Sequence, residues 1–421
     1  MAVVGTKTKE AMRLRLTLLA LCACAAAVRV DAAEESIAGA RNAFDGITPI
    51  VHFRTYYWDS RSTSGSASEA WAAGGWAGAT TPWYGDALQL GVLGYTSQKL
   101  YGPADKAGSQ LLGPDQDPIT VLGQAYASLR YAGQTFTGYR QLIDQPWVNP
   151  QDSRMIPNLF EGYLLAGNAG AVEYTAGYVT KFKARDANSF AWMSSAAGST
   201  GPQRGMILGG ARLPLPDDGA LRVAEQYLVD TYNTAYVDGD YPLALGGAGR
   251  VRLRGQYGNQ QSVGSAGLGT FDTWMYGVDG LWEKGPFGVE AAFTQTSRQR
   301  QTLDPFGDNP SYLNMMQVAF NEAGERAWLI LVAVDFTKWA SGLKAAVSYG
   351  SGRGAIDPTT GAALGSRNET DVRLAYDVDK SSPLRGLSLG VEGSWLNQAG
   401  AASQARQLRV FANYEVPFDL R

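Results

Sequence analysis

The amino-acid sequence predicts an all-β fold, an 18-stranded antiparallel transmembrane β-barrel with long outer loops. Stretches in which polar and apolar residues alternate recur along the chain, whereas helical periodicity is scarce. The breaks between these stretches alternate between short and long, as in barrels with turns on one side and loops on the other. Residues that favour strands and turns are abundant, with 51 Gly, 21 Tyr, 14 Phe and 11 Trp, while 18% of residues are charged.

The N-terminus predicts export. Residues 1–32 are interpreted as a signal peptide, because Arg13 and Arg15 precede the apolar run LTLLALCACAAAV at 16–28 and small residues follow it. The run is too short to span a bilayer, and no later segment has 18 consecutive apolar residues. The first dozen residues look like an over-long leader or an upstream start.

The two cysteines, Cys22 and Cys24, lie within this leader. The mature protein is therefore expected to have no disulfide and no thiol ligand. A lipoprotein signal around these cysteines is the alternative. Residues 33–47 are predicted to form an N-terminal periplasmic segment, and 48–421 the barrel.

Eighteen strands are predicted, an even number that leaves both ends of the barrel on the short-turn side. They are expected near residues 48–59, 69–84, 86–100, 119–132, 134–144, 159–168, 171–186, 204–214, 221–232, 234–244, 249–262, 270–284, 286–298, 325–339, 342–352, 368–379, 385–397 and 404–419.

The segment GRVRLRG shows how one strand divides its two faces. Arg250, Arg252 and Arg254 alternate with Val251 and Leu253, so the three arginines lie on one face of an extended strand. A solvated strand of a soluble sandwich would explain this strand alone. Within a membrane barrel, the arginines are expected to face a water-filled lumen and the apolar pair to face lipid.

A second segment repeats this division. In KFKARD, the cations Lys181, Lys183 and Arg185 alternate with Phe182 and Ala184. The same alternation predicts that the cations face the lumen.

Several segments, taken together and in order, resemble the OprD family of Gram-negative outer-membrane porins, which form 18-stranded monomeric barrels. They cover nearly the whole mature chain. The segments are RTYYWDSR (54–61), LIDQPWVNPQDSRMIPNLFEG (142–162), DTYNTAYVDGDYPL (230–243), FNEAGERAWLILVAVDF (320–336) and GLKAAVSYGSGRG (342–354).

The resemblance implies a third outer loop that folds inward and a ladder of basic residues that leads carboxylate-bearing solutes through the channel. Matched by motif, Arg154 corresponds to the arginine of the constriction loop, Arg54 and Arg61 to the opening strand, and Arg409 to the last strand. Arginine suits such a pathway because its planar guanidinium binds a carboxylate through two hydrogen bonds.

Other pathway residues follow from alternation and from the inward loops. Each of these charges could instead be paired with another charge in the lumen. The strand alternation adds Arg130, Arg140, Lys181, Lys183, Arg250, Arg252 and Arg254, and the acidic candidates are Asp144 and Asp152 in the constriction loop and Asp304 on the opposite wall.

The sequence thus predicts an outer-membrane porin for small carboxylate-bearing solutes, such as amino acids and aromatic or other organic acids. One departure is Glu392, which lies with Gly390 where the family often has arginines, so the ladder is shortened or rerouted. A passive or saccharide-selective porin is the main alternative. An outer-membrane hydrolase would depend on His52, the one histidine, and no G-x-S-x-G, G-x-G-x-x-G or P-loop is present.

We therefore expect no enzyme activity, no cofactor and no metal. The expected partners are small carboxylates, outer-membrane lipid and lipopolysaccharide, and the barrel-assembly machinery during biogenesis. The net charge of −3 gives no reason to expect nucleic acid. The oligomeric state expected from the resemblance is a monomer or a loosely associated trimer.

Overall fold

The computed structural model describes residues 46–399 and 403–418. The predicted signal peptide, Cys22 and Cys24, and most of the predicted segment 33–47 lie outside the described residues. No helix among the described residues is long and apolar enough to cross a membrane.

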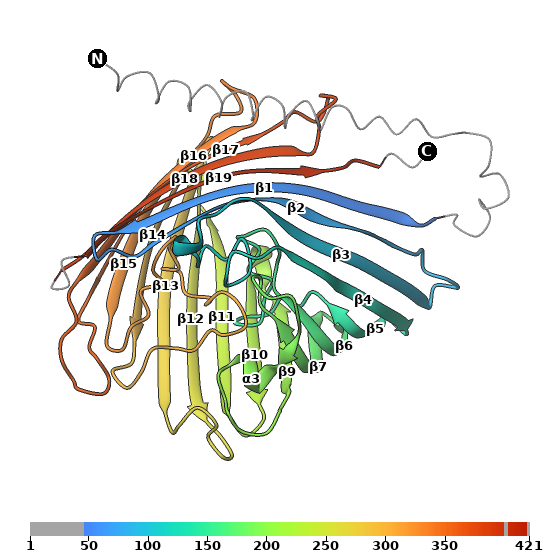
Figure 1. Cartoon of the computed structure of the whole chain (residues 1–421), viewed down its shortest axis with the longest axis horizontal. Coiled ribbons are helices and arrows are strands. Elements are labelled where there is room, and N and C mark those ends of the chain that lie inside the picture. The colour runs from blue at the N-terminus through green and yellow to red at the C-terminus, as the bar shows by residue number, and fades with distance from the viewer. Residues whose placement is uncertain (1–45, 400–402, 419–421) are drawn as a thin grey trace. The chain divides into compact units, whose positions relative to one another are not determined.

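Long antiparallel strands make up most of the described chain (Figure 1). They are β1 Thr48–Ser62, β2 Ala67–Thr80, β3 Leu88–Tyr101, β4 Ile119–Tyr131, β5 Gln134–Gln141, β6 Leu159–Ala169, β7 Val172–Lys183, β8 Ala191–Trp192, β9 Met206–Pro214, β10 Ala220–Leu228, β11 Tyr232–Ala244, β12 Arg250–Ser262, β13 Asp272–Lys284, β14 Phe287–Thr296, β15 Arg326–Asp335, β16 Leu343–Arg353, β17 Arg367–Asp377, β18 Leu387–Gln398 and β19 Ser403–Glu415. The short helical turns are η1 Ala104–Lys106, α3 Met193–Ala196, η2 Pro216–Asp218 and η3 Gly246–Ala248.

The sheet closes on itself. Each long strand pairs with its neighbours in the chain, and β1 pairs with both β2 and β19, with Arg54 opposite Asn413 and Trp58 opposite Arg409. The two-residue β8 pairs with the end of β7 and is not part of the ring. The structure thus confirms the closed barrel of eighteen antiparallel strands. Closure leaves no strand edge exposed to lipid, as spanning a membrane requires.

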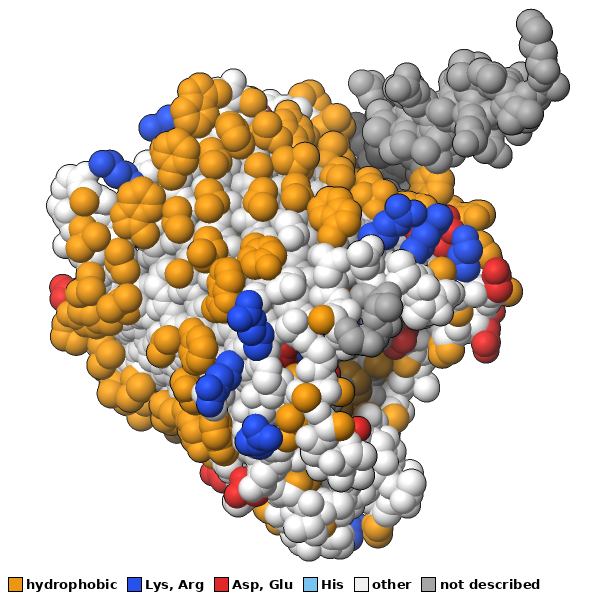
Figure 2. Space-filling model, turned by 90° about the vertical axis from the view of Figure 1, so that its left-hand side faces the viewer, with side chains coloured by type: hydrophobic (Ala, Val, Ile, Leu, Met, Phe, Trp, Pro, Cys, Tyr) orange, Lys and Arg blue, Asp and Glu red, His pale blue; other side chains and the backbone are white. Residues whose placement is uncertain are grey.

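Side chains alternate between the two faces of the wall, as strand geometry dictates. On β12, Leu253 and Tyr257 are 48% and 44% exposed, whereas Gln256 and Gln260 on the other face are buried. The arginines of this strand share the face of the buried glutamines. The outer wall is covered with apolar side chains, which Figure 2 shows over much of one face.

The connections differ between the two ends of the barrel. Residues 132–133, 170–171 and 285–286 form short turns at the end that also holds Thr48 and Glu415. At the opposite end, 102–118, 142–158, 184–205 and 297–325 form long loops. This distribution is typical of outer-membrane barrels, with short turns in the periplasm and long loops outside.

The outer end of β7 differs from the predicted division of faces. The pairing of β6 with β7 shifts at Glu161 and Gly162, which leaves Thr180 without a directly opposite residue. Because one extra residue reverses the faces beyond it, Phe182 is buried against Phe306 of an inward loop instead of facing lipid. The prediction for this segment is therefore wrong for Phe182, and also for Lys181, which the same reversal moves off the lumen-facing side.

The long loops pack inside the wall and make the apolar clusters of the lumen. Met155 and Ile156 from loop 142–158 are buried against Tyr56 and Trp58 of β1. Loop 297–325 contributes Phe306 to a second cluster and Phe320 to a third. The two loops also touch each other, because Val148 forms a parallel bridge with Phe306.

Candidate functional site at the constriction

Loop 142–158 is attached to the barrel wall through Arg54. Its guanidinium donates to both carboxylate oxygens of Asp152, at 2.6 and 3.1 Å, and to the carbonyl oxygen of Arg154. A further hydrogen bond of 2.6 Å joins Arg54 Nε to Asn413 Oδ1 on β19. Arg54 is thus fully engaged in holding the loop, and Asp152 serves as its partner.

Trp58 brings two further arginines together. The guanidinium carbon of Arg154 lies 4.0 Å from the centre of the Trp58 ring, and that of Arg409 lies 4.8 Å from it. The electron-rich faces of an indole attract cations, so one ring holds both charges in place. The three residues come from β1, loop 142–158 and β19.

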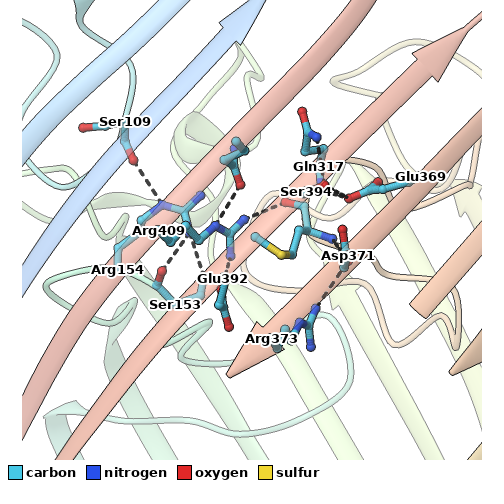
Figure 3. A network of polar contacts seen from close by, with 12 residues as sticks. Ser109, Ser153, Arg154, Gln317, Glu369, Asp371, Arg373, Glu392, Ser394 and Arg409 are labelled. Atoms are coloured by element: carbon cyan, nitrogen blue, oxygen red, sulfur yellow. Dashed lines mark hydrogen bonds and ion pairs between the residues drawn. The ribbon is translucent and has the colours of Figure 1, made fainter. Parts of the chain in front are cut away.

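Arg154 has no carboxylate within 4.0 Å among the described residues. Its Nε donates to the Ser109 carbonyl at 3.0 Å and its Nη1 to the Ser153 carbonyl at 2.7 Å (Figure 3). Burial, followed by the charges of Arg185 and Arg409, lowers the pKa of Arg154 to about 9. The side chain therefore stays cationic at neutral pH.

Arg185 is a second arginine that donates to neutral groups and has no described carboxylate within 4.0 Å. Its Nε donates to Gln110 Oε1 at 3.0 Å and its Nη1 to Ser153 Oγ at 2.9 Å, and no described carboxylate forms an ion pair with it. Burial is the main cause that lowers its pKa. Arg185 is not among the residues that the sequence assigns to the pathway, although it continues the alternation of Lys181 and Lys183.

A polar cavity of about 270 Å³ lies beside Arg185. Gln110 and Asn158 line it together with the arginine, and Asp304 of loop 297–325 lines it as well. Enclosure by the surrounding protein and the charge of Asp308 raise the pKa of Asp304 to about 6. The cavity thus joins a cation that has no described carboxylate within 4.0 Å to Asp304, whose pKa is raised, and Asp186 also lines it.

Glu392 lies against Arg409 at the site where the resemblance suggested another basic residue. Glu392 Oε2 is 3.3 Å from Arg409 Nη1, and Arg409 Nη2 donates to the Met316 carbonyl at 2.7 Å. On β17, Arg373 lies opposite Glu392 in the register. The acid therefore stands between two arginines in this part of the wall (Figure 3).

Two acids of β17 hold loop 297–325 to the wall. Glu369 accepts hydrogen bonds from the backbone amides of Gln317 and Val318, at 2.7 and 3.0 Å, and from Ser394 Oγ at 2.9 Å. Asp371 accepts one from the Met316 amide at 3.2 Å. Figure 3 shows these acids and Arg409 gathered around the loop. The role of these two acids could not be predicted from the sequence, because it depends on where the loop lies inside the barrel.

The three arginines of β12 share one face, and all of them are paired with acids of neighbouring strands. Arg252 forms an ion pair with Asp240, and Arg254 with Asp279. Two further ion pairs join Arg250 Nε to Glu283 Oε2 at 2.8 Å and Arg254 Nη2 to Glu290 Oε1 at 2.9 Å. By the same alternation, two more arginines face the lumen and are paired, Arg212 with Glu173 and Arg222 with Asp238. The sequence pattern did not place these two in the predicted pathway.

Several predicted pathway residues are not brought to the constriction. Arg61 lies on the opposite face of β1 from Arg54 and pairs with Asp59 at 2.9 Å. Arg130 stacks on Trp83, with its guanidinium carbon 3.8 Å from the ring centre, at the short-turn end.

The remaining candidates lie near the outer end. Arg140 and Lys181 both pair with Glu161, at 3.4 and 3.1 Å. Lys183 is fully buried and donates to the Ala184 carbonyl at 3.0 Å. Asp144 is exposed in loop 142–158.

His52 makes contacts with an amide and a ring. It lies 3.3 Å from Asn413 Oδ1 and stacks on Trp76, with 4.0 Å between the ring centres. Neither partner is the hydroxyl nucleophile that a hydrolase would need beside a histidine base.

The chain is similar to outer-membrane porins. A family model described as outer membrane porin, OprD family, matches residues 44–418. The structure of Pseudomonas aeruginosa OccK9 (OpdG) is 21% identical with a TM-score of 0.81, covering 89% of this chain and 99% of that chain. P. aeruginosa OpdK with vanillate is 20% identical with a TM-score of 0.78, covering 88% and 98%. A BenF-like porin from Pseudomonas fluorescens is 17% identical with a TM-score of 0.78, covering 88% and 99%. No curated protein sequence matches the chain.

Proposed function

Because the chain belongs to the OprD family of outer-membrane porins, we propose that its channel selects small solutes that carry a carboxylate. The family and the closed barrel establish a substrate-specific porin of the bacterial outer membrane. The carboxylate preference is the further step, and it rests on the charges at the constriction.

The observation that carries the proposal is the state of Arg154 and Arg185. Both guanidiniums lie among loop residues inside the barrel, and neither has a described carboxylate within 4.0 Å. A buried cation without a counter-ion favours an anionic ligand, because the ligand supplies the charge that the protein omits. Arg409 adds a third cation nearby, although Glu392 partly neutralises it.

The arrangement suits passage as well as binding. A solute that enters the constriction loses part of its hydration, and the guanidinium donors replace some of it. Since Arg154 already donates to Ser109 and Ser153, it offers only part of its hydrogen-bonding capacity to a ligand. Binding of this moderate kind allows the solute to leave again.

The cavity beside Arg185 supports a solute of small size. At about 270 Å³ it has room for a single ring or a short chain. The vanillate in the OpdK structure is an aromatic carboxylate of this size, and it belongs to that protein.

A passive or saccharide-selective porin is the second candidate. It is favoured by the β12 arginines, because Arg250, Arg252 and Arg254 are all paired with acids and thus carry little free charge. In that case the basic residues would balance the lumen acids without selecting a solute.

A bilayer experiment separates the two candidates. The purified protein is incorporated in planar bilayers, and its ionic current is recorded with benzoate, vanillate and neutral sugars. Liposome swelling measures passage of the same solutes. We expect carboxylates to block the current and to cross faster than sugars of similar size. Free passage of sugars with no effect of carboxylates would instead establish the passive porin.

A further inference from the structure

Two arginines lie side by side on the outer face of the barrel, away from the channel. Arg326 is the first residue of β15 and Arg353 is the last residue of β16, so both are at the long-loop end. The register places them directly opposite each other. Both are exposed.

Alternation shows which way these side chains face. Arg326 has the same parity as Trp328 and Ile330, which are 42% and 47% exposed on the lipid-facing side of β15. Arg353 has the same parity as Val347 and Tyr349 on β16, which are 49% and 40% exposed. The pair therefore belongs to the outer face of the wall.

No acid of the described residues forms an ion pair with either arginine. Neither side chain forms a hydrogen bond or ion pair with any part of the chain that the structure describes. Arg298, just beyond β14, is a third exposed arginine without such a partner in the described chain. Like charges directly opposite each other on a sheet are unfavourable unless an anion lies between them.

A second pair of opposed arginines in the same barrel does have an acid beside it. Arg61 and Arg406 also lie directly opposite each other, where β1 meets β19. There Asp59 pairs with Arg61 at 2.9 Å and removes part of the repulsion. No such acid is present beside Arg326 and Arg353 in the described chain.

The position of the pair along the strands favours one kind of anion, the headgroup of a lipid. Trp328 and Tyr349 pack together with 5.5 Å between their ring centres, and aromatic residues of this kind mark the edge of the hydrocarbon region. The strand rises by about 3.3 Å per residue, so Arg326 lies roughly 7 Å beyond Trp328, at the level of lipid headgroups. Figure 2 shows basic side chains beside the apolar side chains of the outer wall.

We propose that Arg326 and Arg353, together with Arg298 just beyond the end of β14, bind the phosphate groups of lipopolysaccharide in the outer leaflet. The charge of the site matches a phosphorylated headgroup, and the apolar wall beneath it matches the acyl chains of the same molecule. Guanidinium groups bind phosphate oxygens through paired hydrogen bonds. The site is separate from the channel and adds a lipid-binding function to the barrel.

The test measures binding of purified lipopolysaccharide to the full protein in detergent, by native mass spectrometry. The double variant Arg326→Gln/Arg353→Gln should bind it at least roughly tenfold more weakly, because charged hydrogen bonds are lost. The matched control Arg250→Gln/Arg252→Gln removes two lumen arginines and should bind like the wild type. Unchanged conductance and unchanged heat-modified migration in gels confirm that the double variant folds.

The source of the phosphate is tested with two further ligands. The first is dephosphorylated lipopolysaccharide. Its affinity for the wild type should be as low as the affinity of the double variant for intact lipopolysaccharide. The second is inorganic phosphate, which at millimolar concentration should not displace intact lipopolysaccharide from the wild type. Equal affinity of wild type and double variant would overturn the proposal, as would an equal loss in the lumen control. Strong competition by inorganic phosphate would identify a free-anion site instead.

Discussion

Arg54 on the first strand holds Asp152 on loop 142–158 with two hydrogen bonds, of 2.6 and 3.1 Å. The same guanidinium donates to the carbonyl of Arg154, so one wall residue fixes both the loop and the arginine at the constriction. Arg54 is 8% exposed and Asp152 is 39% exposed, so the pair is partly shielded from water. We therefore expect the width of the channel at this point to depend on that contact.

Asp152→Asn should therefore loosen the constriction loop. The substitution removes the charge that Arg54 binds and weakens the local attachment by about 1.5–3 kcal/mol, the range for charged hydrogen bonds. We expect larger and noisier single-channel currents, together with faster proteolysis within 142–158. Asp105→Asn, at an exposed aspartate of loop 102–118, is the control and should change neither. Unaltered currents and proteolysis in Asp152→Asn would show that the loop is held by other contacts.

Arg185→Gln should weaken the block by carboxylates. The side chain keeps a polar group near Gln110 and Ser153 but loses its charge, so the benzoate concentration for half-block should rise roughly tenfold or more. Sugar passage should stay the same. Arg250→Gln is the matched control, since Arg250 is exposed and paired with Glu283. If both variants lost the block equally, the effect would come from net lumen charge and not from the constriction.

Much of the wall was predictable because strand alternation is a local property. The arginines of β12 face the lumen as predicted, since no bulge interrupts Arg250 to Gln256. The end of β7 was not predictable in the same way, because the extra residue Thr180 is defined only by its pairing with β6.

The site depends on contacts between distant parts of the chain, and a sequence pattern does not contain them. Trp58, Arg154 and Arg409 meet although they are far apart in the sequence. The pairing of Arg252 with Asp240 also requires the register between β11 and β12. The sequence therefore identifies charged faces, whereas free and neutralised charges can be told apart only in the fold.

The two faces of β12 should respond differently to a new charge. Arg252→Glu places a second carboxylate beside Asp240 in the lumen, so reversal potentials should shift towards cation selectivity while folding persists. Leu253→Arg puts a cation on the lipid-facing side and should cost about 2–4 kcal/mol near the bilayer midplane. Folding into lipid vesicles across a urea series measures this cost. Similar folding defects in both variants would contradict the assignment of the faces.

The affinity of the constriction for carboxylates should depend on pH through Asp304. Its pKa is raised to about 6, so the carboxyl is largely ionised at pH 7.5 and largely neutral at pH 5. An ionised Asp304 repels an anion in the cavity that it shares with Arg185. Binding of benzoate, which itself stays ionised over this range, should therefore strengthen several-fold as the pH falls from 7.5 to 5.

Asp304→Asn isolates this effect, because the amide keeps the shape of the side chain and carries no charge. The variant should bind benzoate at pH 7.5 as tightly as the wild type does at pH 5, with a flat dependence between them. Planar-bilayer currents at fixed ionic strength provide the measurement. A pH dependence that persists in Asp304→Asn would assign the titration to another group. Asp186, which also lines the cavity, and Asp308, whose charge acts on Asp304, are the acids to replace next.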